Sequence, residues 1–335
     1  MSVPRISILM PVRNESRYLK EALLSIFRQT LVDWELIVVD DGSTDDTPDI
    51  LAAASRQDSR LTLLSTGGAG LVSALNMGIA ACSAPLIARM DGDDISHPQR
   101  LEIQACYLDE HPEVGLVACG FHHFPRHSIK SGMSSYEKWQ NCLCSHESIM
   151  LERFVESPFV HPSVMLRKEL LINAGGYQSM GWAEDYDLWL RLASEGVGFF
   201  RIPDTLFFWR DHPERATRTM DEYSRSAFRA CKCHYLLLDY LSGEKNVTIA
   251  GAGLEGRAWQ RLLLKNGIAV TCWIDVDPHK IGRTLHGAPV ISPDQLSDNG
   301  NKILAAIGVK GAREQFREVA SSKGLVDGLN FICVA

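Results

Sequence analysis

The chain has 335 residues, of which 45% are apolar and 22% charged, which excludes wholesale disorder and is typical of a soluble globular protein of about two domains. The formal net charge of −7 gives no support to a nucleic-acid partner. An anionic ligand would therefore need a local device, such as a metal ion, a helix N-terminus or a few arginines.

No apolar run approaches the length of a transmembrane helix, and the chain does not open with a signal-peptide pattern. The nine cysteines are scattered and lack the C-x₂-C spacing of zinc ribbons. We therefore expect a cytoplasmic protein with reduced thiols. A metal cluster on Cys142, Cys144 and His146 is the alternative to buried or incidental thiols.

Strands and helices alternate through the first part of the chain. Short apolar runs predict buried strands, at 5–12, 35–41, 61–65, 86–90 and 114–119. Amphipathic stretches predict the helices between them, at about 14–30, from 47, at 71–81 and at 100–111, the first capped by Asn14 or Ser16. This alternation predicts an α/β fold, a doubly wound and mostly parallel sheet with helices on both faces.

The rest of the chain divides in two. Residues 121–240 are less regular and end in a predicted helix at 223–241, after which "SGEKN" at 242–246 is typical of a linker. A strand, a glycine turn, a helix and a strand then follow in order. We therefore predict one domain over 1–241 and a small second α/β domain over 247–335.

Carboxylates gather where two predicted strands end. Asp40 and Asp41 end one strand, and "DGDD", with Asp91, Asp93 and Asp94, follows another. In wound α/β sheets, ligands bind beyond the carboxyl ends of the strands. Two aspartates in a D-x-D turn can share a hard cation such as Mg²⁺ or Mn²⁺ with substrate phosphates. A solvated acidic turn is the alternative, and the motif alone does not exclude it.

Four motifs in a fixed order indicate which protein family the chain resembles. They are "ISILMPVRNES", "ELIVVDDGSTDDT", "LIARMDGDDISHPQRL" and "WAEDYDLWLRL". Together, over residues 4–219, they resemble the family 2 glycosyltransferases, which have the A-type nucleotide-diphospho-sugar transferase fold. The resemblance implies a metal-dependent inverting enzyme that moves a sugar from a nucleoside-diphosphate donor, with a UDP-sugar favoured, to a hydroxyl of a glycan or lipid-linked acceptor.

The resemblance also implies roles for the nucleotide-binding residues. The loop after the first strand would lie beside the base, through Pro11, Val12, Arg13 and Glu15. Asp41 matches the aspartate that hydrogen-bonds the base, typically a uracil N–H, and Asp40 would support the loop.

In the D-x-D of the family, Asp91 would lie near ribose and sugar and Asp93 would hold Mn²⁺ or Mg²⁺. We expect a structural role for Asp94, as a cap for the helix that begins near Pro98. Arg89 could contact sugar or phosphate, or simply balance the local acids.

Later segments supply the remaining candidates. Asp185 matches the general base of the family, beside Glu184, although a helix start is also enriched in acids. Asp187 should face elsewhere. A catalytic role for His161 competes with that of a core histidine. In "WRDHPERAT", Arg210 could bind phosphate and His212 could complete the metal shell, or His212 could lie on a surface loop.

The second domain carries its own motif. Gly251, Gly253 and Gly256 form G-x-G-x-x-G after a predicted strand, and Asp275 ends the next one, as in dinucleotide-binding folds. The stretch resembles small Rossmann-like nucleotide-binding domains beside sugar-modifying enzymes, and a nucleotide site and a structural appendage both fit.

Three kinds of function remain in competition. Besides a glycosyltransferase, they are an NAD-dependent oxidoreductase or epimerase and a non-catalytic sugar-nucleotide-binding protein. No Tyr-x-x-x-Lys pair supports hydride chemistry. A lipid-linked acceptor would imply peripheral contact with the inner membrane face. The basic and aromatic residues of 223–241 could lie on a bilayer, and packing between the two domains explains them at least as well.

Overall fold

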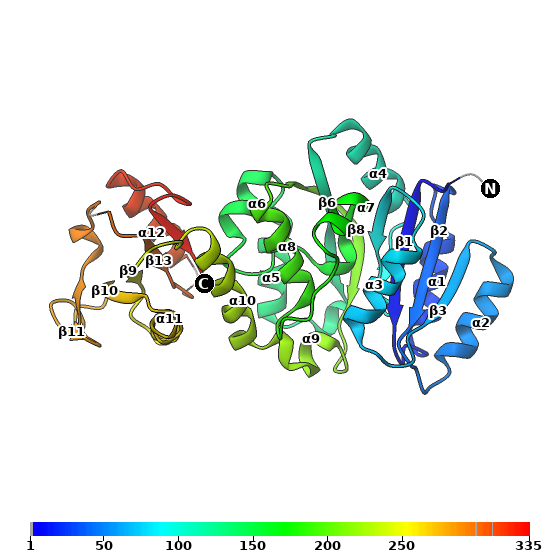
Figure 1. Cartoon of the computed structure of the whole chain (residues 1–335), viewed down its shortest axis with the longest axis horizontal. Coiled ribbons are helices and arrows are strands. Elements are labelled where there is room, and N and C mark those ends of the chain that lie inside the picture. The colour runs from blue at the N-terminus through cyan, green and yellow to red at the C-terminus, as the bar shows by residue number, and fades with distance from the viewer. Residues whose placement is uncertain (1–2, 299, 310) are drawn as a thin grey trace. The chain divides into compact units, whose positions relative to one another are not determined.

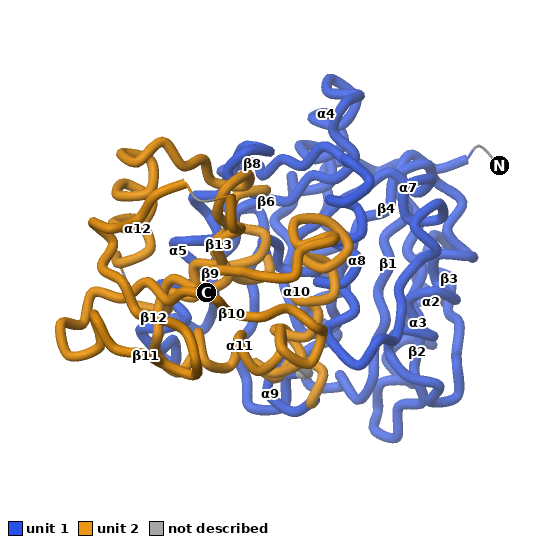
Figure 2. Tube along the Cα trace, turned by 60° about the vertical axis from the view of Figure 1, so that its left-hand side comes forward, with its two compact units in different colours: residues 1–149, 158–220 blue, residues 150–157, 221–335 orange. Residues whose placement is uncertain are grey.

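The computed structural model describes residues 3–298, 300–309 and 311–335. It divides into two compact units, of which unit 1 comprises residues 1–149 and 158–220 and unit 2 comprises 150–157 and 221–335 (Figures 1 and 2). None of the helices in the described ranges is long and apolar enough to cross a bilayer.

Unit 1 is built on one eight-stranded sheet, in the order β3-β2-β1-β4-β7-β6-β8-β5. Its strands are β1 (Ile6–Val12), β2 (Trp34–Asp40), β3 (Leu61–Ser65), β4 (Leu86–Arg89), β5 (Ile95–Ser96), β6 (Val114–Phe124), β7 (Met165–Arg167) and β8 (Gly198–Arg210). The first four strands of the chain are parallel, β7 runs antiparallel to both neighbours, and β6 and β8 are parallel. The predicted α/β fold with a mostly parallel sheet is confirmed, and the antiparallel strands β5 and β7 make the sheet mixed.

The helices of unit 1 cover both faces of this sheet. They are α1 (Leu19–Phe27), α2 (Thr47–Gln57), α3 (Leu71–Ala81), α4 (Arg100–Glu110), α5 (Ser131–Cys142), α7 (Lys168–Asn173), α8 (Glu184–Ser194) and α9 (Ala216–Thr219). Alternate residues of β1, among them Ile6 and Ile8, pack with α1, α2 and α4 in one core. On the other face, a Cβ added at Gly78 of α3 would lie 2.1 Å from Leu9 Cδ1, so glycine lets this helix lie close to the sheet.

The predicted cap of the first helix is wrong. Helix α1 begins at Leu19 after Tyr18, with no side-chain cap. Asn14 has a φ of 56° and its Oδ1 accepts from the amide of Thr44 at 2.8 Å, while the amide of Ser16 donates to Asp45 at 3.0 Å. These polar residues therefore fasten the loop after β1 to the loop after β2.

Unit 2 has a six-stranded sheet in the order β11-β12-β10-β9-β13-β14, parallel except for the pair β11–β12. Its elements are β9 (Asn246–Ala250), β10 (Ala269–Ile274), β11 (Thr284–Leu285), β12 (Ala288–Ile291), β13 (Ile303–Ala305), β14 (Phe331–Cys333), α10 (Arg225–Leu238), α11 (Leu254–Lys265) and α12 (Ala312–Ser322). Strand β9 lies between β10 and β13, so the carboxyl ends of these three strands meet where the winding direction changes.

The observed division differs from the predicted boundary at residues 242–246. Helix α10 groups with unit 2, where Arg229 pairs with Glu255 at 2.8 Å and the buried Lys232 donates to the carbonyl of Val155 at 2.7 Å. Segment 150–157 also groups with unit 2, although helix α6 (His146–Glu152) begins in unit 1. These tertiary contacts leave no trace in local composition, which is why the linker pattern suggested a later boundary.

Candidate active site

The acidic loop follows β4 at the carboxyl edge of the sheet of unit 1. Carboxylate oxygens of Asp91, Asp93 and Asp94 lie within 4.8 Å of one another. Throughout residues 3–298, 300–309 and 311–335, no other group of three or more His, Cys, Asp or Glu side chains is arranged to hold a metal ion. Carboxylates this close repel, so the loop needs a cation or shared protons.

Asp94 is fully buried at the centre of this loop. Its Oδ1 accepts the amide of Arg210 at 2.7 Å, whereas its Oδ2 has no hydrogen-bond partner in the described part of the chain. Burial, followed by the charges of Asp93 and Asp91, raises the pKa of Asp94 well above its ordinary value. The predicted helix cap is wrong, because α4 begins after Gln99 without a side-chain cap. Asp94 instead ties the loop to the end of β8.

The segment after β8 closes the other side of the acidic loop. Arg210 donates from Nε to the carbonyl of Asp93 at 2.6 Å, and its guanidinium lies 4.3 Å from the ring of Tyr18. His212 is 8% exposed, and its Nε2 lies 2.8 Å from Asp93 Oδ2. The oxygens of the three aspartates suit Mg²⁺ or Mn²⁺, and His212 places an imidazole nitrogen beside Asp93.

Arg89 holds the first aspartate of the loop. It is 2% exposed, and its Nη2 donates to Asp91 Oδ1 at 2.6 Å. Its Nε is also buried and has no hydrogen-bond partner among the residues that the structure describes. Arg89 therefore neutralises Asp91 and keeps one donor for a further group.

The loop after β1 lies directly against the acidic loop. Pro11 and Val12 are the last, buried residues of β1. A Cβ added at Gly92 would lie 2.8 Å from Val12 Cγ1 and 3.2 Å from Glu15 Cγ, so only glycine fits between Asp91 and Asp93. Burial, with the charges of these two aspartates, raises the pKa of Glu15 to about 9.

Asp41 contacts both the glycine loop at 67–70 and Arg13. It is 4% exposed, and its Oδ1 accepts from the hydroxyl of Thr66 and from the amide of Gly70 at 2.9 Å. Its Oδ2 lies 3.6 Å from Nη1 of the exposed Arg13. The structure thus places Arg13 and Asp41 side by side, with part of the carboxylate already used by the glycine loop at 67–70.

Two acids begin helix α8. Glu184 is 5% exposed and Asp185 is half-buried. Burial, followed by the charge of Glu184, raises the pKa of Asp185 well above its ordinary value. Asp185 is therefore a stronger base than a free aspartate.

Asp187, on the same helix, has a structural environment. It is 1% exposed, accepts from Trp182 Nε1 at 2.9 Å and pairs with Arg191 Nε at 2.8 Å. It therefore faces away from the candidate site, as its position two residues after Asp185 predicts.

His161 is brought to the start of α8. Its Nε2 lies 2.7 Å from the hydroxyl of Tyr177, and its Nδ1 lies 3.5 Å from Glu184 Oε1. Sequence reasoning missed Tyr177. The available signal was "GGY", since Gly175 and Gly176 have φ values of 77° and 70° and aim the tyrosine inward.

The alternative cysteine cluster is not formed. His146 accepts the amide of Phe199 at Nδ1 over 3.2 Å, and Cys144 Sγ lies 3.5 Å from the carbonyl of Asn141. All nine cysteines are free thiols.

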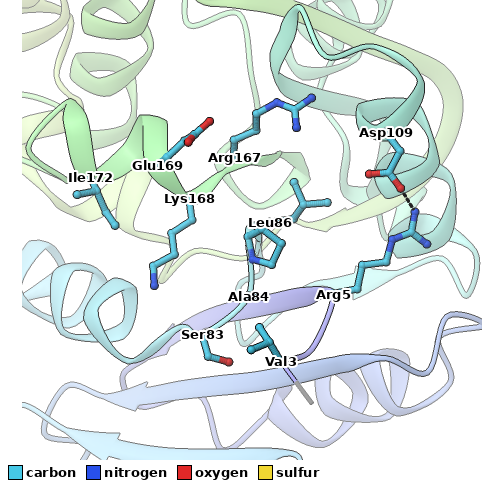
Figure 3. Close-up of a pocket in the computed structure, with 11 residues that line it drawn as sticks. Val3, Arg5, Ser83, Ala84, Leu86, Asp109, Arg167, Lys168, Glu169 and Ile172 are labelled. Atoms are coloured by element: carbon cyan, nitrogen blue, oxygen red, sulfur yellow. Dashed lines mark hydrogen bonds and ion pairs between the residues drawn. The ribbon is translucent and has the colours of Figure 1, made fainter.

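A cavity of about 590 Å³ lies at the other end of the sheet, where β4 begins (Figure 3). Arg5, Arg167 and Lys168 contribute to its lining. Arg5 is paired with Asp109, Arg167 donates to the carbonyl of Leu108 at 2.7 Å, and Lys168 donates to that of Cys82 at 2.5 Å. These three cations are already engaged by a carboxylate and by backbone carbonyls of neighbouring elements, so the acidic loop is the better candidate site.

In unit 2, the three glycines of the second motif have different surroundings. Gly251 has a φ of 100°, and a Cβ there would lie 2.6 Å from the carbonyl oxygen of Ala306. A Cβ at Gly256 would lie 1.9 Å from the carbonyl oxygen of Gly251, whereas a Cβ at Gly253 would meet nothing within 4 Å. Two glycines are thus required by packing, and the third leaves the loop open.

Asp275 closes this glycine loop. Its Oδ2 accepts the amide of Ala252 at 2.8 Å and lies 3.0 Å from Lys280 Nζ. The acid that the motif assigns to a ribose is therefore already engaged by the protein itself.

Comparison with known proteins identifies the family. The family model described as "Glycosyl transferase family 2" matches residues 7–174, which include the acidic loop and end before unit 1 is complete. The amylovoran biosynthesis glycosyltransferase AmsE of Erwinia amylovora is 34% identical over 60% of this chain and 74% of its own length. An Escherichia coli UDP-Gal:alpha-D-GlcNAc-diphosphoundecaprenol beta-1,3-galactosyltransferase is 28% identical over 71% of this chain and 86% of its own.

Solved structures share the fold. Staphylococcus aureus TarS 1–349 in complex with UDP-GlcNAc aligns with a TM-score of 0.57 at 16% identity, over 70% of this chain and 66% of that chain. The mannosyltransferase PcManGT of Pyrobaculum calidifontis, in complex with GDP-Man and Mn²⁺, aligns with a TM-score of 0.51 at 23% identity, over 71% and 63%. By its family match, its relatives and the A-type fold of unit 1, the chain belongs to the family 2 glycosyltransferases.

Proposed function

We propose that this glycosyltransferase moves a hexose, with inversion, from a nucleoside-diphosphate donor to a hydroxyl of a glycan or lipid-linked glycan. A UDP-sugar is favoured as the donor, and Mn²⁺ or Mg²⁺ as the cofactor. One relative is named for UDP-Gal and a diphosphoundecaprenol acceptor, and one structural neighbour holds UDP-GlcNAc. The observation that carries the proposal is the acidic loop with its unpartnered buried oxygen on Asp94, beside His212.

Asp93 and His212 would hold the cation, with Asp94 completing the donor set. When bound, the cation supplies positive charge to the diphosphate leaving group. Arg13 and Asp41, with Pro11, Val12 and Glu15, would accommodate the nucleotide. Asp91, held by Arg89, would orient the ribose and sugar.

Asp185 would act as the general base. It takes the proton of the acceptor hydroxyl as that oxygen attacks the anomeric carbon and the bond from carbon to the diphosphate oxygen breaks. Burial, followed by the charge of Glu184, raises the pKa of this base. Attack from the face opposite the leaving group inverts the anomeric carbon, and the nucleoside diphosphate leaves with the bonding electrons.

We infer a cytoplasmic protein that makes peripheral contact with the inner membrane face. The support is the diphosphoundecaprenol acceptor for which one relative is named, since a lipid carrier would place that acceptor at a membrane surface.

Unit 2 could add a second function, the binding of a nucleotide at Gly251, Gly253, Gly256 and Asp275. The specific observation in its favour is Gly253, whose open surroundings at the start of α11 admit the close approach of a phosphate to the backbone. The engaged carboxylate of Asp275 argues for a structural role of that residue.

Calorimetric titration tests both proposals together. The full chain is titrated with UDP, GDP, dTDP and NAD, each with Mn²⁺ and again with EDTA. A nucleoside diphosphate that binds only with the cation, and no longer binds to Asp93→Ala, supports the transferase site. Binding of NAD without a cation, and of no diphosphate, would move the chemistry to unit 2 and favour an oxidoreductase.

Turnover needs a separate variant. Asp185→Asn should keep donor binding and lose sugar transfer by about 10²-fold or more, as expected for a general base. Transfer by Asp185→Asn at the wild-type rate would refute the assignment of the base. A wild-type protein that binds the donor and transfers nothing to any glycan acceptor would point to a binding protein instead.

A further inference from the structure

One oxygen of Asp41 is fully used by the glycine loop at 67–70 and by the threonine before it. Asp41 is 4% exposed, and its Oδ1 accepts hydrogen bonds from the hydroxyl of Thr66 and from the amide of Gly70 at 2.9 Å. A carboxylate oxygen has two lone pairs, so these two donors occupy both of them. Any further donor must therefore bind to Oδ2.

The hydroxyl of Thr66 has its proton on the side of the aspartate. The backbone amides of Gly68 and Ala69 both lie 3.3 Å from this hydroxyl oxygen, and an amide N–H can only donate. The lone pairs of the oxygen therefore accept these two amides, which leaves its proton for Asp41. Thr66 thus joins the carboxylate to the backbone of the glycine loop.

The glycine loop is itself held against the end of β2. A Cβ at Gly42 would lie 2.8 Å from the amide nitrogen of Gly68, so the loop packs directly on this glycine. The amide of Thr66 donates to the carbonyl of Asp40 at 3.1 Å. The carboxylate of Asp41 is therefore oriented by groups that are themselves fixed to the strand end.

The other oxygen of Asp41 has more open surroundings. Within the described part of the chain, no group donates a hydrogen bond to Oδ2, which lies 3.6 Å from Nη1 of the exposed Arg13. A Cβ added at Gly67, Gly68 or Gly70 would meet nothing within 4 Å. The lack of side chains on this loop leaves room for a planar ring.

A single acceptor beside an arginine suits one kind of base. Uracil and thymine present a ring N–H between two carbonyl groups, so the N–H can donate to Oδ2 while a carbonyl accepts from Arg13. Cytosine has a lone pair in place of this N–H, and that lone pair would face the lone pairs of Oδ2. Guanine presents two adjacent donors, and the second finds no free lone pair on Oδ1. A polar group left unpaired in this way costs binding free energy.

We propose that Thr66 is a positioning residue that, with the amide of Gly70, restricts Asp41 to one available oxygen and so selects a donor whose base is uracil or thymine. The inference rests on the proposed binding of the nucleotide at Arg13 and Asp41. The fold of unit 1 does not by itself decide the base, since one structural neighbour holds UDP-GlcNAc and another GDP-Man.

An isosteric exchange at Asp41 gives the sharpest test. In Asp41→Asn the amide oxygen takes the place of Oδ1, because Gly70 and Thr66 both donate there, and the NH₂ group replaces Oδ2. Calorimetric titration of the full chain with Mn²⁺ should show that the wild type binds UDP about 10-fold more tightly than CDP. The variant should reverse this order. An order that stays the same in Asp41→Asn would overturn the proposal.

The threonine is tested with UDP and GDP. The wild type should bind UDP about 10-fold more tightly than GDP, and Thr66→Ala should lose most of this preference, because the carboxylate gains a free lone pair and room to turn. Thr66→Ser keeps the hydroxyl and should keep the preference. Thr62→Ala, at an exposed position of β3, is the matched control. An equal loss of both affinities in Thr66→Ala would indicate a purely structural role and contradict the proposal.

The same titrations separate this selection from the proposed function. If UDP, CDP and GDP bind equally well to the wild type with Mn²⁺, the nucleotide site stands, and the selection by Asp41 and Thr66 is refuted. If no nucleoside diphosphate binds, the proposed donor site is wrong and the selection of a base falls with it.

Discussion

Replacing Asp94 by asparagine should stabilise the cation-free protein. The carboxylate is fully buried, and its oxygens lie within 4.8 Å of those of Asp91 and Asp93. At this separation two unit charges repel by about 3.5 kcal/mol at an effective dielectric constant of ~20. Asparagine removes the charge and keeps an oxygen for the amide of Arg210.

Because burial and the neighbouring carboxylates raise the pKa of Asp94, a proton on this carboxylate would offset part of the repulsion in the wild type. We therefore expect Asp94→Asn to gain about 1–3 kcal/mol at neutral pH, or about 2–12 °C in the unfolding temperature for a domain of this size. Because the folded-state pKa of Asp94 is raised above its unfolded value, the wild type should lose stability as pH rises between those two values. The variant should lack this contribution.

Thermal unfolding of EDTA-treated protein, monitored by tryptophan fluorescence between pH 4 and 8, measures the effect. Asp33→Asn is the matched control, since Asp33 is exposed and loses the same charge. With saturating Mn²⁺ the order should reverse, because the wild type keeps one more ligand for the cation. If EDTA-treated Asp94→Asn unfolds at or below the wild-type temperature, repulsion between the carboxylates does not destabilise the cation-free protein and the reasoning is refuted.

Two further variants test other parts of the structure. Glu184→Gln should lower the pKa of Asp185 and move the acid limb of kcat/KM to lower pH, and an unchanged limb would show that Glu184 does not act on the base. Gly256→Ala should destabilise unit 2 by several degrees in thermal unfolding, because its Cβ would lie 1.9 Å from the oxygen of Gly251. Gly253→Ala is its control, and equal losses in the two variants would contradict the packing argument.

The sheet of unit 1 was largely predictable because its first strands are short apolar runs with regular helices between them. The antiparallel strand β7 was missed, since three residues at 165–167 carry no detectable period. Strand β6 continues to Phe124, beyond the predicted end at residue 119. Its last residues pair with β8 through residue Arg210, a long-range contact that the local pattern does not contain.

The candidate site was predictable wherever acids end a strand or begin a helix. Asp91, Asp93 and Asp185 follow from such positions together with the family resemblance. Tyr177 was missed because its position depends on hydrogen bonds to Asn76, a residue distant in sequence. Pairings of this kind are set by tertiary packing, which single-sequence patterns do not record.

The end of β8 shows how the fold prepares the acidic loop before any ligand binds. Arg210 donates its amide to Asp94 and its Nε to the carbonyl of Asp93, and its Nη2 reaches Glu21 at 2.6 Å. The next residues bring His212 to 2.8 Å from Asp93. These bonds already hold the loop in place. A cation that binds there would therefore reduce the repulsion between the carboxylates without the entropic cost of ordering the loop. The end of one strand therefore holds the three carboxylates of the loop together despite their repulsion.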